Sequence, residues 1–144
     1  MTQHFTLKEM IYSKTAADLG IANYPDTVQL FHLFELAHSL ELVREYFDNR
    51  KIVITSAFRC KALNKAVGGA KNSAHLNGYA ADFYVVGNKT MEEYFLYLKE
   101  IDMNINQCIL EDTVIHLDIT PGGKREFLVR ERVNGGFKYI RQYM

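Results

Sequence analysis

A histidine and an aspartate seven residues apart most strongly constrain how this chain can fold. They are His75 and Asp82 in the block Ser73–Asp82, SAHLNGYAAD, where Gly78 between them permits a backbone turn. Imidazole nitrogen and carboxylate oxygen are both ligands of zinc, and a catalytic zinc site needs three protein ligands and an open position for water. A fold that uses this pair must bring a third ligand to it from elsewhere in the chain.

Length and composition indicate one folded domain covering residues 1–144, with 48% hydrophobic residues available for a core. Seventeen basic residues balance seventeen acidic ones, which argues against the basic surface of nucleic-acid-binding proteins. Charged residues interrupt every apolar stretch well before the roughly 18 residues that a membrane span requires. We therefore expect neither a nucleic-acid partner nor a membrane span, and we expect a monomer.

The N-terminal segment, MTQHFTLKEMIYS, lacks the basic start, apolar run and small-residue cleavage site of a secretory signal. We expect synthesis to leave the protein in the cytoplasm, unless a phage-type route releases it to the cell wall. Cys60 and Cys108 match no paired-cysteine metal spacing, so we expect two reduced and largely buried thiols.

Helix signals dominate the first third of the chain. Thr6 and Glu9 have capping-box spacing, Ser13 is a natural cap for a second short helix, and Gly20 is a natural stop. From Asp26, apolar residues recur every three or four positions, which predicts a long helix with one buried face: Val28, Phe31, Phe34, Ala37, Leu40, Val43 and Phe47. His32 and His38 on this helix are interpreted as surface or packed residues, because neither has a metal-binding spacing.

The rest of the chain predicts an α+β fold in which helices pack on one side of an antiparallel sheet. Strands are expected at 51–55, 79–86, 106–111, 114–120, 126–133 and 137–143, and helices at 61–67 and 90–101. The glycine-rich turns 121–123 and 134–136 are typical of hairpins.

His116 is the remaining histidine in a suitable place. It lies in the middle of a predicted strand, where alternation would turn its neighbours Ile115 and Leu117 to the opposite face. Taken alone, such a histidine is more often packed on a sheet than bound to a metal. Beside Asp82, it would complete a set of two histidines and one carboxylate.

The block from Ser73 to Asp82, preceded by Ser56-x-x-Arg59 and followed by the strand with His116, resembles the zinc D-alanyl-D-alanine carboxypeptidases and L-alanyl-D-glutamate endopeptidases. The 63–69 run LNKAVGG and the N-terminal pattern of 5–25 resemble a small branch of that family. The resemblance implies a fold like that of these peptidases and of the hedgehog signalling domain.

The resemblance also implies roles for individual residues. His75, Asp82 and His116 would bind Zn2+, and Arg59 would hold or polarise a substrate carbonyl or carboxylate, with a surface ion pair as its structural alternative. Ser73 would lie beside the substrate or merely cap the turn before His75. The implied partner is the stem peptide of peptidoglycan.

The position of the catalytic base departs from the family pattern. Well-studied members have an acidic residue three positions before the last histidine ligand, followed by tryptophan, whereas this chain has Thr113 there and no tryptophan. Glu111 and Asp112 are the available substitutes, and in the hedgehog domain the corresponding glutamate also lies further upstream. We choose Glu111, because a bend between Asp112 and Thr113 could aim its longer side chain at the metal; a solvated turn acid is the alternative.

The resulting hypothesis is a zinc peptidase that cuts an amide bond in the peptidoglycan stem, either at the terminal D-alanine or within the stem. A second hypothesis is a zinc-containing module that binds cell-wall peptide or protein without cutting it, which the acid missing at Thr113 would permit. A third is a structural protein without metal, which requires that all the candidate ligands and Arg59 occur together by coincidence.

Overall fold

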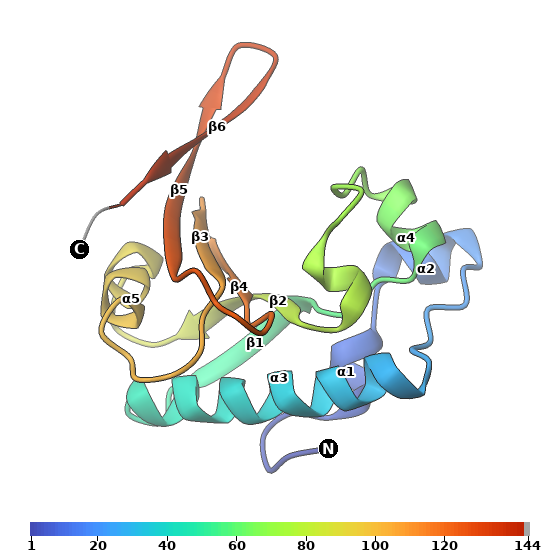
Figure 1. The fold of residues 1–144 in the computed structure, drawn as a ribbon, viewed down its shortest axis with the longest axis horizontal. Coiled ribbons are helices and arrows are strands. Elements are labelled where there is room, and N and C mark those ends of the chain that lie inside the picture. The colour runs from blue at the N-terminus through green and yellow to red at the C-terminus, as the bar shows by residue number, and fades with distance from the viewer. Residues whose placement is uncertain (143–144) are drawn as a thin grey trace.

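A computed structural model describes residues 1–142 of the chain and has an α+β fold (Figure 1). The helical elements in chain order are α1 (Leu7–Ile11), α2 (Lys14–Leu19), α3 (Thr27–Tyr46), α4 (Lys61–Ala66), the short 3-10 helix η1 (Ala74–Asn77) and α5 (Met91–Leu98). The strands are β1 (Lys51–Ser56), β2 (Ala80–Val86), β3 (Gln107–Glu111), β4 (Val114–Asp118), β5 (Glu126–Val133) and β6 (Gly136–Arg141). The part of β6 predicted to reach Tyr143 lies outside the described residues.

Across residues 1–142 the six strands form one sheet in the order β1-β2-β4-β3-β5-β6. Neighbouring strands are antiparallel except for β3 and β5, which are parallel. The predicted α+β class is therefore confirmed, with a mixed and mostly antiparallel sheet. The order also places β2 directly beside β4, although 27 residues separate Val86 from Val114 in the sequence, and this pairing brings the candidate ligands together.

The predicted hairpin at the 121–123 turn is wrong. β4 is already hydrogen-bonded on both sides, by β2 and β3, so the chain crosses the end of β3 and adds β5 to its far side. Gly123 permits this crossing, because a Cβ there would lie 2.4 Å from Oδ1 of Asn104 and 2.5 Å from the carbonyl oxygen of Ile105. The Arg125 guanidinium secures the crossing by donating to the carbonyl oxygens of Lys99, Ile101 and Met103.

The local helix signals are confirmed. Thr6 and Glu9 form a reciprocal capping box at α1, and the Ser13 hydroxyl accepts from the backbone N–H of Ala16 at the start of α2. Gly20 ends α2 in the left-handed conformation, with φ +67°. These contacts are made within four residues, which explains why sequence alone could locate them.

The predicted buried face of α3 is confirmed at its C-terminal end, where Ala37, Leu40, Val43 and Phe47 are buried, and is wrong at its N-terminal end. Val28 and Phe31 are 61% and 64% exposed, and Phe34 is 38% exposed. At that end Leu33 and Leu36 are buried in their place, in line with Ala37, Leu40 and Val43. This helix is apolar on more than one face, so a spacing of three or four residues fits several series, and only packing selects the buried one.

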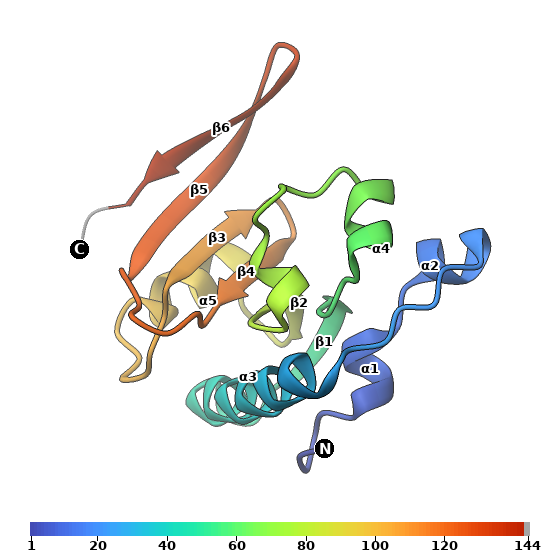
Figure 2. The same ribbon diagram turned by 45° about the vertical axis from the view of Figure 1, so that its right-hand side comes forward.

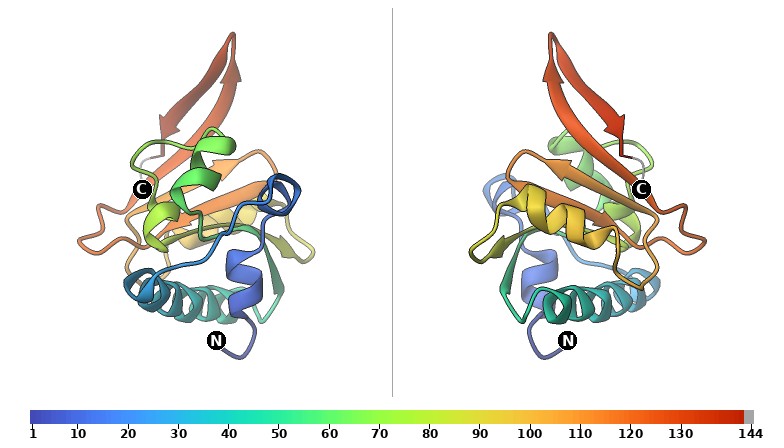
Figure 3. Two further views of the ribbon diagram at one scale, coloured as in Figure 1. Left: turned by 90° about the vertical axis from the view of Figure 1, so that its right-hand side faces the viewer. Right: turned by 90° about the vertical axis from the view of Figure 1, so that its left-hand side faces the viewer.

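The core lies between the sheet and helices α1, α3 and α5, as predicted for helices packed on one side (Figures 1 and 3). Strand residues that face it include Phe83, Ile115 and Leu117, each fully buried. The opposite face of β2 and β4 carries polar side chains, and the 57–79 segment with α4 and η1 lies beside it (Figure 2). Among residues 1–142, no helix is long and apolar enough to cross a bilayer.

The β5–β6 hairpin extends beyond the rest of the sheet (Figure 1). The turn at Asn134-Gly135-Gly136 closes it, as predicted, and Gly135 has φ +82°. Phe127 at the base of β5 is 1% exposed, whereas Val133 near the tip is 45% exposed. The base of the hairpin therefore belongs to the core, and its outer half is free to line a surface.

Candidate metal centre

The register of β2 and β4 places Asp82 directly opposite His116. Ile115 and Leu117 point into the core with 0% exposure, so alternation turns the His116 side chain to the polar face. Nδ1 of His116 lies 2.8 Å from Oδ1 of Asp82. The expectation that His116 faces a cleft beside Asp82 is confirmed.

His75 reaches the same carboxylate from η1, with Nε2 3.4 Å from Oδ1 of Asp82. Its other ring nitrogen, Nδ1, lies 2.6 Å from the carbonyl oxygen of Ala57, and since a carbonyl only accepts, Nδ1 must carry the proton. Nε2, which faces the centre, is then the ring nitrogen available to bind a metal ion. A backbone carbonyl that orients a histidine in this way is the usual support of a metal ligand.

One local contact and one contact from helix α3 hold η1 in place. The Ser73 hydroxyl accepts from the backbone N–H of His75, and Nε2 of Gln29 donates to the carbonyl oxygen of Leu76. Gly78 has φ +81°, and a Cβ there would lie 2.7 Å from the carbonyl oxygen of Gln29. Gly78 is therefore required by both the turn and the contact with α3. Ser73 makes the capping contact that was its alternative reading, and it also lines the cleft.

His75, Asp82 and His116 each offer one ligand atom, and these atoms all lie within 4.8 Å of one another. Two ligands at about 2.0–2.1 Å from a tetrahedral zinc ion lie about 3.3 Å apart. The 3.4 Å from His75 to Asp82 fits that spacing, and the 2.8 Å from His116 requires a small separation of the pair. Two imidazoles and one carboxylate form the donor set of a catalytic zinc site, so the residues fit this ion.

Burial and charge shift the pKa values of the acidic group and its histidine partner in opposite directions. Burial by itself would raise the pKa of Asp82, but hydrogen bonds from His116 and His75 outweigh it and lower the pKa. Burial would lower the pKa of His116, but the Asp82 carboxylate raises it. Asp82 is therefore ionised at neutral pH and provides a negative charge for a cation.

Arg59 contacts the other oxygen of the same carboxylate, with Nη2 3.5 Å from Oδ2 of Asp82. Its Nε donates to the Ser56 hydroxyl and its Nη1 to Oδ1 of Asn64. The side chain is 15% exposed and lines the cleft, so it is not the surface ion pair of the alternative interpretation. Burial lowers the pKa of Arg59, an effect that the charges of Asp82 and Glu111 oppose.

Sequence reasoning gave no role to Asn64, which positions Arg59. Asn64 is 5% exposed, accepts from Arg59 and donates to the carbonyl oxygen of Ala70 at 2.9 Å. A Cβ at Gly69 would lie 2.1 Å from Oδ1 of Asn64 and 2.8 Å from Nη1 of Arg59. Its place in the LNKAVGG run was the available signal, but only the fold reveals the contact.

The predicted bend between Asp112 and Thr113 is present, because Glu111 pairs with Val114 across a two-residue turn. Oε1 of Glu111 lies 4.0 Å from Nδ1 of His116, and its side chain is 19% exposed. Asp112 is 50% exposed and lies outside the cleft lining, with its carboxylate facing Arg130 and Arg132. Of the two candidate acids, Glu111 is the one beside the candidate metal ligands.

Burial raises the pKa of Glu111, and the charge of Asp82 adds to this shift. The charges of His116, Arg130 and His75 oppose it. A carboxylate with a raised pKa accepts a proton more readily than one in water, which suits a general base.

These residues line a cleft of about 690 Å³ between the η1 segment and the β5–β6 hairpin. Leu128 and Tyr139 form its hairpin side, opposite Ser73 and Asn72. Asp118, two positions after His116 on the same strand face, lines it as well, with its carboxylate accepting from Asn106 and Thr120. Strand alternation from His116 could have predicted that Asp118 lies on the cleft side of β4. Leu128 and Tyr139 could not be predicted in this way, because only the β3–β5 and β5–β6 pairings bring them to the cleft.

His32 and His38 are surface or packed residues as predicted, whereas Cys60, predicted to be largely buried, is only partly buried. His32 stacks on Tyr79 with ring centroids 4.0 Å apart and contacts the carbonyl oxygen of Asn77, so it packs α3 against the segment after η1. His38 is exposed. Cys60 and Cys108 are free thiols, and Cys108 is buried. Within residues 1–142, His75, Asp82 and His116 make up the one group of three suited to hold an ion.

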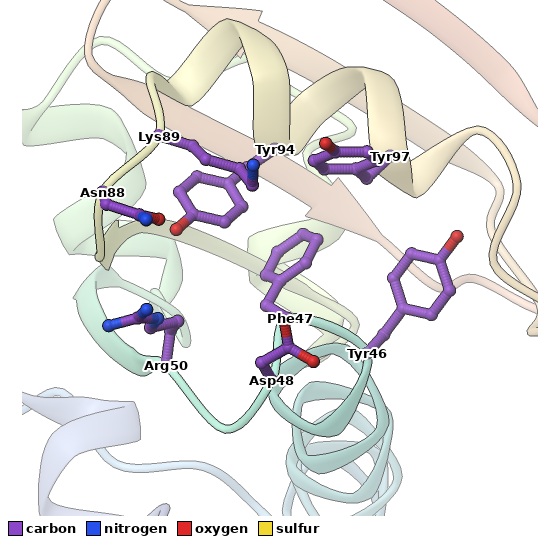
Figure 4. A pocket seen from close by; sticks show the side chains of 8 residues that line it. All are labelled: Tyr46, Phe47, Asp48, Arg50, Asn88, Lys89, Tyr94 and Tyr97. Carbon is purple, nitrogen blue, oxygen red and sulfur yellow. The ribbon is translucent and has the colours of Figure 1, made fainter.

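A second hollow, of about 490 Å³, lies between the end of α3 and α5 (Figure 4). Its walls combine aromatic side chains from both helices with charged ones from the adjacent loops: Tyr46, Phe47, Asp48, Arg50, Asn88, Lys89, Tyr94 and Tyr97. None of the candidate site residues lies there. The other cleft is lined by groups whose pKa values are shifted, which identifies it as the site of chemistry: Arg59, Asp82, Glu111 and His116.

The family model for Peptidase M15 matches residues 3–118. The chain belongs to the Peptidase M15 family. This match includes all three candidate ligands, Arg59 and Glu111, and it ends before the β5–β6 hairpin. The family comprises zinc peptidases that act on peptidoglycan peptides, so its chemistry agrees with the donor set in the cleft. No curated protein matches this chain.

Proposed function

We propose that this chain is a zinc peptidase that hydrolyses an amide bond in the stem peptide of peptidoglycan. The convergence of Nε2 of His75, Oδ1 of Asp82 and Nδ1 of His116 in one cleft carries the proposal, because it brings three ligands from separate segments to one point. Membership of the Peptidase M15 family supports the choice of zinc and of the substrate class.

His75, Asp82 and His116 would hold the ion. When bound, zinc supplies Lewis-acid chemistry that acidifies water and polarises a carbonyl. Glu111 accepts the proton of the attacking water at Oε1, the oxygen nearer the ligands, and transfers it to the departing amine. The raised pKa of Glu111 favours acceptance of the water proton, and a bound cation would lower that pKa and so ease release of the proton to the amine.

Arg59 would stabilise negative charge on the substrate. A guanidinium has five N–H donors, and three contacts, with Ser56, Asn64 and Asp82, hold it in place. The remaining donors can bind a carbonyl oxygen as it becomes an oxyanion, or a substrate carboxylate. Ser73, which accepts from His75, still has its own O–H to donate to the peptide.

The deciding experiment is mass spectrometry of muropeptides digested with zinc-loaded protein, with a chelator-treated sample as control. The products report both turnover and the bond that is cut, whether at the terminal D-alanine or inside the stem. Glu111→Gln should retain one zinc per chain and lose about 10²- to 10⁴-fold in kcat. Unchanged hydrolysis by this variant would transfer the base role to Asp112 or to another group.

A zinc-containing binding module is the competing function, and Thr113 in the family's usual acid position is the observation that favours it. It predicts that zinc-loaded protein retains muropeptides without releasing amines. Intact muropeptides after prolonged incubation, together with measurable binding, would decide in its favour.

A further inference from the structure

The β5–β6 hairpin lies outside the residues matched by the family model, yet it reaches the candidate base. The match ends at residue 118, and the hairpin covers residues 126–141. Parallel pairing of Leu110 with Val129 places the next residues, Glu111 and Arg130, side by side. Nη1 of Arg130 lies 2.8 Å from Oε2 of Glu111.

The two oxygens of the Glu111 carboxylate therefore have different surroundings. Oε2 accepts from Arg130, and Oε1 faces the candidate metal ligands, 4.0 Å from Nδ1 of His116. Among residues 1–142, the bond from Arg130 is the one hydrogen bond that the Glu111 carboxylate accepts. A charge-assisted hydrogen bond to one oxygen fixes the direction of the other.

The hairpin holds Arg130 itself in place. Its guanidinium lies 4.2 Å from the ring centroid of Phe137 on β6, and its Nη2 faces the Asp112 carboxylate at 3.5 Å. Its side chain is 19% exposed, and its buried Nε has no hydrogen-bond partner among residues 1–142. Arg130 is thus packed between an aromatic ring and two carboxylates rather than solvated.

From these contacts we propose that Arg130 is a positioning residue that orients Glu111 for proton transfer, so that the hairpin is a working part of the catalytic cleft. The inference rests on the proposed function, in which Glu111 is the base. It assigns the orientation of that base to a segment outside the matched family region.

The test compares Arg130→Ala with Arg132→Ala in zinc-loaded full-length protein acting on muropeptides. Arg132 is the matched control, because it lies on the same hairpin, over the same Phe137 ring at 5.6 Å and near Asp112, but is 77% exposed and does not contact Glu111. Arg130→Ala should lower kcat about tenfold to 100-fold with KM changed less than twofold, since a misdirected base slows chemistry without weakening binding. Arg132→Ala should retain the wild-type kcat and KM.

Two further variants separate positioning from general structural damage. Arg130→Lys restores a charge but not the planar fork, so it should recover only part of the loss. Adding Arg130→Ala to Glu111→Gln should cause no further loss of kcat, because Arg130 acts through Glu111. In metal-free protein, the shift in melting temperature caused by Arg130→Ala should likewise be smaller in the Glu111→Gln background.

Equal kcat values for the Arg130→Ala and Arg132→Ala proteins would overturn the inference, as would a full additional loss in the double variant. Should Arg130→Ala not fold, Arg130→Lys takes its place in both comparisons. Failure of the proposed function gives a different result: Glu111→Gln would itself retain full activity, or the wild-type protein would release no amines.

Discussion

Adding one methyl group at Gly69 should displace Arg59 without touching the metal ligands. The new Cβ would lie 2.1 Å from Oδ1 of Asn64, so that atom must retreat by about 1.3 Å to reach ordinary contact at 3.4 Å. Asn64 is held on two sides, by Arg59 and by the carbonyl oxygen of Ala70, so this retreat breaks both hydrogen bonds. Overpacking of this kind costs about 1–3 kcal/mol of stability.

The consequence for catalysis follows from the second contact. The same Cβ would lie 2.8 Å from Nη1 of Arg59, so the guanidinium must shift, and Nη2 beside Asp82 shifts with it. A displacement of about 1 Å in a catalytic group can lower the rate about 100-fold. We therefore expect Gly69→Ala to lose about tenfold to 100-fold in kcat/KM on muropeptides while retaining one zinc per chain.

Gly68→Ala is the matched control. Gly68 has φ +72° and no atom within 4 Å of an added Cβ, so the substitution strains the backbone by about 1–2 kcal/mol without approaching Arg59. Urea unfolding followed by circular dichroism, zinc analysis and muropeptide hydrolysis compare the two variants. If Gly69→Ala is as active as Gly68→Ala, the close approach to Asn64 does not position Arg59 and the reasoning fails.

Three further predictions concern stability. Zinc bound to the folded protein at 100 times its dissociation constant should stabilise it by about 2.7 kcal/mol, so a chelator should lower the melting temperature; an unchanged melting curve argues against a metal site. In metal-free protein, Asp82 has a lowered pKa, so it stabilises the folded state above its ordinary pKa of 3.8 and loses this effect as pH falls. His116 has a raised pKa, so it stabilises the folded state below its ordinary pKa of 6.5 and loses this effect as pH rises. Glu111, whose pKa burial raises, contributes fully below its ordinary value of 4.5 and loses this contribution as pH rises above it, so pH-dependent melting should show greatest stability near pH 4 to 4.5. Asp82→Asn should flatten both limbs of the profile, and wild-type pH dependence in this variant would contradict the assignment. Asn23→Ala should cost about 2–4 kcal/mol in urea unfolding, because its amide bonds the buried backbone of Ile11, Phe58 and Cys60, and a loss below 1 kcal/mol would show that water replaces these bonds.

Much of the local structure could be predicted from the sequence because its causes are local. Caps at Thr6, Ser13 and Thr90 involve atoms three residues apart, and each is present. Strand alternation around His116 correctly separated the core-facing Ile115 and Leu117 from the polar face. The two ligands in one block, together with a histidine on a later strand, were enough to predict the composition of the candidate centre.

The tertiary structure decided which distant segments meet. Several apolar series on α3 satisfied the helical period, and packing against the sheet selected Leu33 and Leu36 over Val28 and Phe31. No local signal could reveal that β4 is already paired on both sides, so the hairpin expected before β5 became a crossing to the far side of β3.

The same distinction applies within the cleft. His75 and Asp82 were recognisable in the sequence as residue types that bind a cation. Their alignment depends on contacts between segments: the Ala57 carbonyl that leaves Nε2 of His75 free, and the β2–β4 register that places Asp82 opposite His116. The sequence by itself determined which groups were available for chemistry, and the fold decided their directions, because a hydrogen bond between distant segments exists only after the sheet has brought them together.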